Sequence, residues 1–502
     1  MKSYLIIPMA GTGERFVKLG YKTYKVFLPI DKKFTILEKI VANFKGIDLQ
    51  VIILANFKSF RNKYDKFLKR KNFHLINVEN HKKGPLFTLY LAQEKINNII
   101  KKNKNIFISY SDINWSWNIK SVLKFLKNKK ITIFTHKNFH PHLEVNSRSD
   151  FCLVKNNKII NILEKKTFSK DYKNDFLALG CYYIKELAYI NNFFKRKHNI
   201  FFSKKEFYLV TLIKYLIKNN IKVTNFNIEN FVHLGIPDQY VDFLNWKNLL
   251  VKEKNNSLLF TKNSCVMLMA GKGTRVSKFK NQKPFLLYKA KPIYKYIFDK
   301  FGSKEKIVIT NKNFVNKINK KKYKVFCINE TSSMFNSIFE ARNILQNKSN
   351  YFLTSCDCFG NFNTLDFKKF IIEKKSDLTL FAFKYSNLQK NLGNSHTQLK
   401  IKNKKVYDVE VKKKYKNFQY GHAGFFWIQN GNIFKYLYSF KVSKYYKNLN
   451  REVLIDDYFK FLIKNKLIKA SYFLLDNYVH IGSKPEYLEY LYWNNYFKKE
   501  YE

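Results

Sequence analysis

The chain has 502 residues, and its 93 Lys or Arg against 37 Asp or Glu give a formal net charge of +56 at pH 7. This length exceeds one ordinary hydrophobic core and favours two domains of roughly 200–250 residues each. Hydrophobic residues make up 46% of the chain, which is enough for a core in each domain. No apolar run reaches the ~18 residues of a membrane helix. The N-terminal stretch MKSYLIIPMAGTGERF continues into glycines and an arginine without a signal-peptide cleavage site. We therefore expect a cytoplasmic protein without a membrane span.

The excess of basic residues favours attraction to phosphate-bearing ligands, but it does not by itself indicate a nucleic-acid partner. Lysines are spread along the whole chain, and Asn, Ile, Phe and Tyr are abundant with them, which is typical of a skewed composition. The six cysteines contain no CxxC pair, and no histidines are spaced with them as in a zinc site, so no zinc site is predicted. We expect small phosphate compounds as partners and no nucleic acid, and the sequence leaves the oligomeric state open.

Short apolar runs alternate with polar stretches of helical period in both halves of the chain. We expect strands at residues 4–10, 51–56 and 105–112 in the first half, and at 265–270, 306–310 and 351–357 in the second. Such alternation predicts an α/β fold, in which a mostly parallel sheet is covered by helices on both faces. Ligands of these sheets bind at the carboxyl ends of the strands.

The chain repeats itself at long range. The pattern MAGxGxR occurs at residues 9–15 and again at 269–275, and FVHLG at 231 recurs as YVHIG at 478. The offset is nearly constant, because 357 − 112 = 245 for an Asp pair and 480 − 233 = 247 for a His pair. A period this long indicates a duplicated domain. We predict domain 1 at residues 1–250, a linker at 251–264 and domain 2 at 265–502.

Each MAGxGxR pattern places bare backbone at the end of a predicted strand, where N–H groups can approach phosphate oxygens closely. The two loops consist of Ala10, Gly11, Thr12 and Gly13, and of Ala270, Gly271, Lys272 and Gly273. Neither loop is a GxGxxG fingerprint or a Walker A motif. Arg15 and Arg275 suit a bidentate grip on a leaving pyrophosphate. Lys25 and Lys283 follow within reach of a phosphate group.

Because of these loops, both halves resemble the sugar-1-phosphate nucleotidyltransferase family. The signature of that family is an AGxGxR loop followed by a Pro-Lys-Pro-like segment. The resemblance covers the whole chain and is greatest to the branch encoded with capsule and surface-polysaccharide genes. It rests on segments in family order, among them HKKGPLFTLYLA, NIFISYSDINW and IINILEKKTF, and later NETSSMFNSIFEAR, YFLTSCDCF and VYDVEVKKKY. The resemblance implies two tandem Rossmann-like domains of the nucleotide-diphospho-sugar transferase type.

The resemblance also implies a reaction and roles for residues. A sugar phosphate oxygen attacks the α-phosphorus of a nucleoside triphosphate, and pyrophosphate leaves. Mg²⁺ is the implied cofactor, with Asp112 and Asp357 as its first ligands. Lys165 and Lys412 fall where the family places a lysine on the sugar phosphate. Thr88 and Ser333 match the segment near the base and ribose.

The chain departs from the family pattern at two points. His233 and His480 stand where the family commonly carries a second metal-binding Asp, and imidazole is a poor ligand for Mg²⁺. Ligation and simple packing against the strand end explain these histidines equally well. Domain 1 reads Tyr24-Lys25-Val26, whereas domain 2 keeps a Pro after Lys283.

Three alternatives stay open beside a sugar-phosphate enzyme. One or both domains could be a nucleotide-binding or basic scaffold that has lost catalysis, given the missing second Asp. A phosphocholine-type cytidylyltransferase fits the same motifs. A GT-A glycosyltransferase fits less well, because its usual DxD metal motif is absent: the candidate positions read SDI and CDC.

Overall fold

The computed structural model describes residues 2–57, 65, 70–100, 105–143, 149–203, 205–251, 263–273, 282–384, 396–402, 405–412 and 420–501. The chain divides into two compact units. Unit 1 consists of Met1–Leu244 and Asn495–Glu502, and unit 2 consists of Asn245–Asn494. The division falls inside helix α9 (Pro237–Leu250), and most of the predicted linker lies outside the described residues.

The described part of unit 1 contains a mixed nine-stranded sheet in the order β3-β2-β1-β4-β9-β6-β10-β8-β7. Its strands are β1 (Ser3–Pro8), β2 (Leu49–Ala55), β3 (Phe73–Asn77), β4 (Asn105–Ser109), β6 (Ile131–His136), β7 (Phe151–Lys155), β8 (Lys158–Leu163), β9 (Phe176–Ile184) and β10 (Val223–Asn227). Strands β3, β2, β1 and β4 run parallel, and β9 is antiparallel to both β4 and β6.

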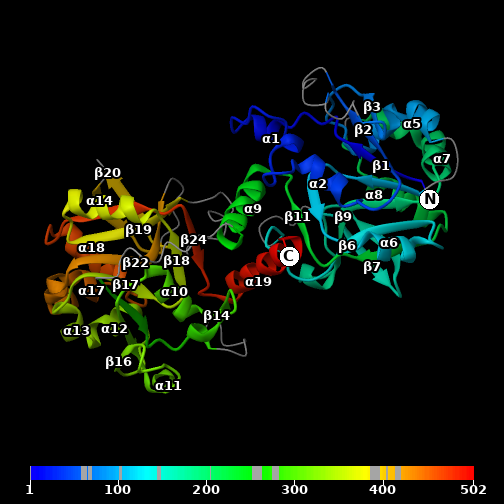
Figure 1. Ribbon diagram of the computed structural model, residues 1–502. Coiled ribbons are helices and arrows are strands. Elements are labelled where there is room, and N and C mark those ends of the chain that lie inside the picture. Colours follow the sequence, from blue (N-terminus) through cyan, green and yellow to red (C-terminus); the bar gives the residue numbers. More distant parts are fainter. Residues whose placement is uncertain are drawn as a thin grey trace. The chain divides into compact units, whose positions relative to one another are not determined.

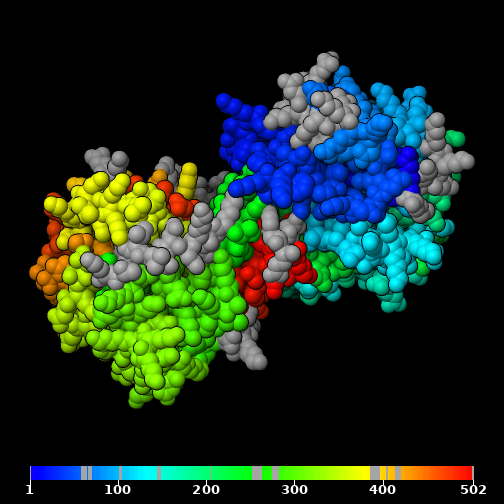
Figure 2. Space-filling model, in the orientation of Figure 1, coloured from blue at the N-terminus to red at the C-terminus, as the bar shows by residue number. Residues whose placement is uncertain are grey.

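The helices of unit 1 lie around its sheet (Figure 1). They are α1 (Glu14–Val17), α2 (Ile36–Ala42), α4 (Pro85–Leu91), α5 (Gln93–Ile99), α6 (Ile119–Leu126), α7 (Ala188–Lys197), α8 (Leu209–Lys218) and α9, with 3-10 turns at η1 (Lys25–Phe27), η2 (Tyr172–Asn174) and η3 (His198–Phe202). In the space-filling view the exposed N-terminal residues, in blue, lie on one side of unit 1 (Figure 2).

Both faces of the unit 1 sheet are covered. Alternate residues of a strand point to opposite faces, and Ile6 and Ile108 belong to a core cluster with α4, α5, α7 and α8. On the opposite face Phe107 is fully buried, and its ring centroid lies 5.0 Å from that of Phe44, just after α2. Strands that are buried on both faces need continuous apolar runs. This is why the strands β1, β2 and β4 can be predicted from the sequence.

Unit 2 contains a nine-stranded sheet of the same arrangement within its described residues, in the order β16-β15-β12-β17-β22-β19-β23-β21-β20. The strands are β12 (Ser264–Met269), β15 (Glu305–Thr310), β16 (Lys324–Cys327), β17 (Ser349–Ser355), β19 (Leu378–Lys384), β20 (Gln398–Lys402), β21 (Lys405–Glu410), β22 (Tyr420–Asn430) and β23 (Ala470–Leu474). The six predicted strands are therefore confirmed as β1, β2, β4, β12, β15 and β17.

The helices and short strands of unit 2 complete the fold. The helices are α10 (Ile293–Phe301), α11 (Lys312–Val315), α12 (Met334–Glu340), α13 (Arg342–Gln346), α14 (Thr364–Lys374), α16 (Leu437–Val442), α17 (Lys444–Lys447), α18 (Ile455–Lys464) and α19 (Lys484–Tyr501), with 3-10 turns η5 (Lys283–Phe285) and η6 (Gly431–Tyr436). Small antiparallel pairs are β5 (Ile113–Trp115) with β11 (Phe231–His233) in unit 1, and β18 (Cys358–Asn361) with β24 (Asn477–His480) and β13 (Leu287–Tyr288) with β14 (Lys291–Pro292) in unit 2.

The predicted α/β class, a mixed sheet with helices on both faces in each half, is confirmed. Parallel β1 and β4 end at the same sheet edge, which brings the Gly loop after β1 beside Asp112 after β4. In unit 2, β12 and β17 place Gly271 and Asp357 in the same way. Among the described helices, none is both long enough and apolar enough to cross a bilayer.

Candidate functional site

The Gly loop of unit 1 is held in place by Tyr24. Its hydroxyl lies within hydrogen-bonding distance of two carbonyl oxygens, at 2.6 Å from that of Gly11 and 3.0 Å from that of Met9. Gly13 begins α1 with a φ of +65°, and a Cβ on it would lie 2.9 Å from the Tyr24 ring. Only glycine combines this backbone conformation with such a close ring. Tyr24 therefore fixes the loop from the position directly before Lys25.

His81 and Thr88 hold the Gly loop on the side away from Tyr24. The His81 N–H donates to the Ala10 carbonyl at 3.1 Å, and the His81 Nε2 atom lies 3.0 Å from the Thr88 hydroxyl. Thr88 is 2% exposed and sits on α4, whose N-cap is Gly84. The predicted nucleotide-binding Thr88 thus reaches the Gly loop through His81.

Lys25 and Asp112 meet across the sheet edge, with 3.0 Å between the Lys25 Nζ and Asp112 Oδ2 atoms. Burial opposes ionisation of Asp112, but Lys25 and His233 outweigh it and lower the pKa of the carboxyl below its usual value. The Leu234 N–H donates to the Asp112 carbonyl at 2.7 Å, which ties the segment after β11 to this residue. Asp112 is therefore an anion at neutral pH, held beside one fixed cation.

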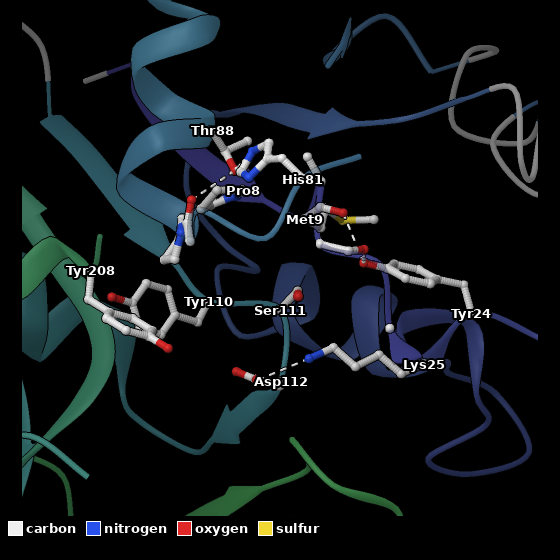
Figure 3. A pocket seen from close by; sticks show the side chains of 15 residues that line it. Pro8, Met9, Tyr24, Lys25, His81, Thr88, Tyr110, Ser111, Asp112 and Tyr208 are labelled. Carbon is white, nitrogen blue, oxygen red and sulfur yellow. Dashed lines mark hydrogen bonds and ion pairs between the residues drawn. The ribbon is translucent and has the colours of Figure 1, made fainter. Parts of the chain in front are cut away.

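These groups line one pocket of about 190 Å³ (Figure 3). Its wall consists of the Gly loop, Lys25, Thr88, Tyr110, Asp112 and Tyr208, together with neighbours such as His81. Figure 3 shows the Lys25 and Asp112 side chains pointing toward one another below Ser111, with the rings of Tyr110 and Tyr208 on one side. A loop of bare backbone, an ammonium and a carboxylate around one cavity suit a phosphate-bearing ligand.

Lys165 contacts the pocket wall by a cation–π interaction with Tyr208. Its ammonium lies 4.8 Å from the centroid of Tyr208, and its backbone N–H donates to Asp150 Oδ1 at 3.1 Å. Lys165 has a left-handed φ of +54°, and Lys412 in unit 2 has one of +49°. Left-handed lysines are uncommon, so the two positions share an unusual backbone shape as well as their place after a strand hairpin.

Unit 2 repeats the loop geometry around different partners. Gly273 has a φ of +66°, and a Cβ on it would lie 3.5 Å from Lys283 Cβ. The Thr331 N–H donates to the Ala270 carbonyl at 3.1 Å, as His81 does to Ala10. The Thr331 hydroxyl lies 2.6 Å from that of Ser337 on α12. Ser337 thus corresponds to Thr88, whereas the predicted Ser333 is the N-cap of α12 and accepts from the Asn336 N–H.

The carboxylate of Asp357 is more completely paired than that of Asp112. Its Oδ2 atom lies 2.5 Å from the Lys283 ammonium and 3.4 Å from His480 Nε2, and its Oδ1 atom accepts from the Ser355 hydroxyl at 2.5 Å. Burial opposes its ionisation, but Lys283 and His480 hold the pKa of Asp357 well below its usual range.

The two histidines at equivalent places have opposite electrostatics. Burial, which Asp112 only partly offsets, lowers the pKa of His233. Burial acts in the same direction on His480, but Glu486 and Asp357 outweigh it and raise its pKa to about 9. His233 is therefore neutral and His480 a cation at pH 7.

The structure brings the Gly loop, Lys25, Thr88 and Asp112 together in one pocket. Lys165 does not line this pocket but contacts the ring of Tyr208, which does. Arg15 is exposed on α1, Lys272 is exposed near Glu330, with 3.9 Å between their charged atoms, and Arg275 lies outside the described residues. Sequence reasoning missed Tyr24, His81, Tyr110, Tyr208 and Ser337 as parts of the two sites. His81 carried a signal, since it begins the segment HKKGPLFTLYLA, but nothing in the sequence indicated that it contacts the Gly loop.

The donor atoms of unit 1 fit Mg²⁺. This ion binds through one or two carboxylates and takes waters and substrate phosphates as its other ligands. Asp112 is the one carboxylate among the described residues that line the pocket, and the neighbouring His233 adds a nitrogen that Mg²⁺ binds poorly. Asp357 fits less well, because both of its oxygens already contact partners within unit 2.

No family model matches the sequence, and no curated protein matches it. Among solved structures, a nucleoside-diphosphate-sugar pyrophosphorylase from Vibrio cholerae is similar over 48% of this chain and 99% of its own, with 19% identity and a TM-score of 0.39. An inositol-1-phosphate CTP transferase from T. maritima is similar over 49% of this chain and 95% of its own, with 16% identity and a TM-score of 0.37. A UDP-glucose pyrophosphorylase complexed with UDP-glucose is similar over 48% of this chain and 100% of its own, with 16% identity and a TM-score of 0.38.

Proposed function

We propose that this protein is a nucleotidyltransferase whose unit 1 transfers a nucleotidyl group from a nucleoside triphosphate to a sugar-1-phosphate or a similar phosphate monoester. One observation carries the proposal: the Gly loop, Lys25, Thr88 and Asp112 converge on one pocket at the carboxyl ends of β1 and β4. A phosphate oxygen of the monoester attacks the α-phosphorus, the bond from that phosphorus to the bridging oxygen breaks, and pyrophosphate leaves.

The residues of unit 1 suit the charges of this reaction. The N–H groups of the Gly loop receive the triphosphate, and Arg15 on α1 neutralises the pyrophosphate as it leaves. Lys25 carries its positive charge between Asp112 and the pocket, where it offsets the negative charge of the reacting phosphates. Lys165 serves the acceptor phosphate from the side of Tyr208. Mg²⁺, held through Asp112, supplies charge neutralisation when bound.

The pairing of Asp357 in unit 2 favours a second function for that unit, which is to bind a phosphate ligand without catalysing a reaction. The Asp357 carboxylate is enclosed by Lys283, His480 and Ser355, so it offers less to a hard cation than Asp112 does. The common sheet order supports the proposal that the two units arose by duplication. We infer that Lys283 and Lys412 in unit 2 bind phosphate ligands in a scaffold or regulatory role.

The test is Mg²⁺-dependent pyrophosphate release from a panel of nucleoside triphosphates paired with sugar-1-phosphates and phosphocholine. Wild type is compared with Asp112→Asn, Asp357→Asn and the double variant, each checked for an unchanged melting temperature. We expect release with one pair, its loss in Asp112→Asn and its retention in Asp357→Asn. Equal rates in wild type and Asp112→Asn would sink the assignment of the reaction to unit 1.

The resemblance to the capsule-linked branch of the sugar-1-phosphate nucleotidyltransferases extends the proposal. In that reading the product supplies an activated precursor to surface-polysaccharide synthesis in the cytoplasm. The substrate panel addresses this directly, because a sugar-1-phosphate acceptor supports it and a phosphocholine acceptor overturns it.

A further inference from the structure

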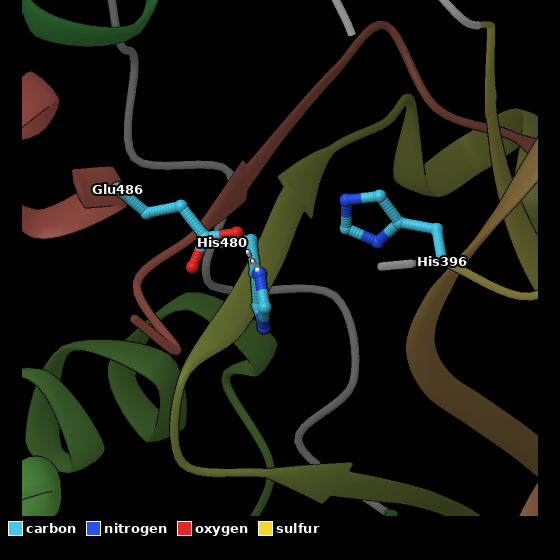
Figure 4. Close-up of side chains that lie close together, drawn as sticks. All are labelled: His396, His480 and Glu486. Atoms are coloured by element: carbon cyan, nitrogen blue, oxygen red, sulfur yellow. Dashed lines mark hydrogen bonds and ion pairs between the residues drawn. The ribbon is translucent and has the colours of Figure 1, made fainter. Parts of the chain in front are cut away.

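Three side chains with metal-ligating atoms lie together in unit 2, at a place where unit 1 has no equivalent set. His396 precedes β20, His480 ends β24, and Glu486 is in the first turn of α19. One potential ligand atom of each lies within 4.8 Å of those of the other two. Figure 4 shows the ring of His396 facing His480, with Glu486 on the other side of His480.

The contacts within this cluster are short and defined. His480 Nδ1 lies 2.6 Å from Glu486 Oε1, and the centroids of the two imidazole rings are 5.4 Å apart. The second oxygen of Glu486 accepts from the Ser483 hydroxyl at 2.7 Å. A hydrogen bond of this kind orients a carboxylate before any ion arrives, as the outer partners of metal ligands do.

Neighbouring side chains and a glycine also fix the imidazole rings of His396 and His480. The Tyr478 ring lies 5.7 Å from that of His396, and Phe383 packs against both, at 4.3 Å from Tyr478 and 5.2 Å from His396. A Cβ on Gly482 would lie 2.4 Å from His480 Nε2, so only glycine at this position leaves room for the imidazole. The side chains are therefore positioned by rigid surroundings and not by the cluster alone.

We propose that unit 2 binds one divalent cation of intermediate softness, of which Zn²⁺ is the type, through His396, His480 and Glu486. The ion displaces a proton of His480 to solvent, because imidazole ligates a metal only in its neutral form. Two imidazoles and one carboxylate form a donor set that suits Zn²⁺ and leaves a fourth position open. Nitrogen donors favour Zn²⁺, Co²⁺, Ni²⁺ and Cu²⁺ over Mg²⁺, whose ligands are oxygens. The site therefore differs in chemistry from the Mg²⁺ site proposed at Asp112.

Unit 1 shows that the cluster is particular to unit 2. Gln239 follows His233 at the same spacing as Glu486 follows His480, because 239 − 233 = 486 − 480 = 6. Ser149 precedes β7 by the same two positions by which His396 precedes β20. Unit 1 thus keeps one of the three ligands and carries neutral Ser and Gln at the others. These natural residues supply the replacements for the test.

The bound ion would join three segments of unit 2 that are distant in sequence: the start of β20, the end of β24 and the start of α19. A ligand that binds only the folded state stabilises it. Zn²⁺ should therefore raise the melting temperature of the transition that reports unit 2, and this readout does not depend on any enzymatic activity. The proposal and the proposed function can fail separately, since the function lies in unit 1.

The experiment uses the full chain, stripped of metal with a chelator and titrated with Zn²⁺ by calorimetry. Co²⁺ is a second probe, because its visible absorption reports the geometry and type of its ligands. The variants are His396→Ser and Glu486→Gln, and the matched controls are His198→Ser, at an exposed histidine, and His233→Gln in unit 1. Melting curves of the metal-free variants establish that each one folds.

We expect one saturable Zn²⁺ site per wild-type chain and the same site in both controls. His396→Ser and Glu486→Gln should each weaken it by at least about 100-fold, the upper end of the loss that changes around metal ligands cause. The proposal is overturned if wild type binds no stoichiometric Zn²⁺, or if both folded variants bind it as tightly as wild type. If His396→Ser fails to fold, Glu486→Gln decides alone, because it keeps the size of the side chain.

Discussion

The Lys25 ammonium lies 3.0 Å from the Asp112 carboxylate although 87 residues separate the two in the chain. The parallel pairing of β1 with β4 makes this contact, since the segments after both strands leave the sheet at one edge. The pair lies in the wall of the unit 1 pocket, so the ammonium contacts the carboxylate and is also placed to contact a phosphate group in the pocket.

Lys25→Met should therefore lower kcat/KM for pyrophosphate release by about 100-fold, the size of effect seen when one charge-stabilising donor is removed from a reaction centre. Methionine keeps most of the length of the unbranched side chain and removes the ammonium with its charge and its hydrogen bond to Asp112. Steady-state kinetics on the substrate pair found in the panel measure the change. Lys32→Met, at an exposed position of unit 1, is the control and should leave the rate unchanged. Equal losses in both variants would show a general charge effect instead of a role for this pair.

Gly84 provides a stability prediction, because its backbone and its surroundings both require glycine. It has a φ of +81°, and a Cβ on it would lie 2.6 Å from the Phe207 carbonyl oxygen. Gly84→Ala should reduce the free energy of unfolding by about 3 kcal/mol, the upper end of the range for strained positions. Urea unfolding followed by circular dichroism measures this loss.

Gly20 is the matched control for Gly84. It also has a φ of +81°, but a Cβ on it would meet no atom within 4 Å. Gly20→Ala therefore carries the backbone strain without the clash and should cost only about 1 kcal/mol. Equal losses in the two variants would mean that the loop before α4 moves away from Phe207 at little cost.

Sequence patterns predicted the parts of the site that local rules determine. The apolar runs predicted the strands, and the MAGxGxR pattern at a strand end predicted the Gly loop, with Lys25 as the lysine that follows it. Asp112 was implied by the resemblance to the nucleotidyltransferase family. Tyr110 and Tyr208 could not be predicted as neighbours, since they come together only through the packing of α8 against the strand edge; there the Leu209 N–H donates to the Tyr110 hydroxyl at 3.0 Å. Aromatic residues are too frequent in this chain for a single one to stand out.

Ser333 illustrates a different limit of sequence reasoning. The segment TSSMFNS offers several hydroxyls, and spacing alone does not tell which one faces the Gly loop. In the structure Ser333 caps α12, while Ser337, one turn later, makes the contact that Thr88 makes in unit 1. How α12 is rotated relative to the Gly loop depends on tertiary packing. This rotation decides that Ser333 caps the helix and that Ser337 makes the contact beside the loop.

The Thr88–His81 hydrogen bond should matter for both stability and nucleotide affinity. Thr88→Val keeps the shape of the side chain and removes the hydroxyl, which leaves the Nε2 atom of the half-buried His81 without this 3.0 Å partner. We expect a loss of about 1 kcal/mol in the free energy of unfolding. Because His81 also donates to Ala10, KM for the triphosphate should rise while kcat changes less. Thr88→Ser retains the hydroxyl and should behave as wild type; a Thr88→Ser defect as large as that of Thr88→Val would point to the methyl group instead.

Asp150 should make the stability of unit 1 depend on pH. Burial is the main cause that raises its pKa from 3.8 to about 6; Glu164 adds to the rise, while the Lys165 N–H and the charges of Lys165 and Lys214 oppose it. The folded state thus holds a proton that the unfolded state releases at lower pH. Its stabilising contribution is full below the unfolded pKa near 4 and is lost as the pH rises through 6.

Asp150→Asn removes this titration while keeping an oxygen for the Lys165 N–H, which lies 3.1 Å from Asp150 Oδ1. The difference in unfolding free energy, variant minus wild type, should therefore increase by on the order of 1 kcal/mol between pH 5 and pH 8. Urea unfolding at the two pH values measures it, and Asp48→Asn, at an exposed carboxyl, should show no such increase. A difference that stays constant with pH would mean that Asp150 has the same pKa in the folded and unfolded states, and would contradict the prediction.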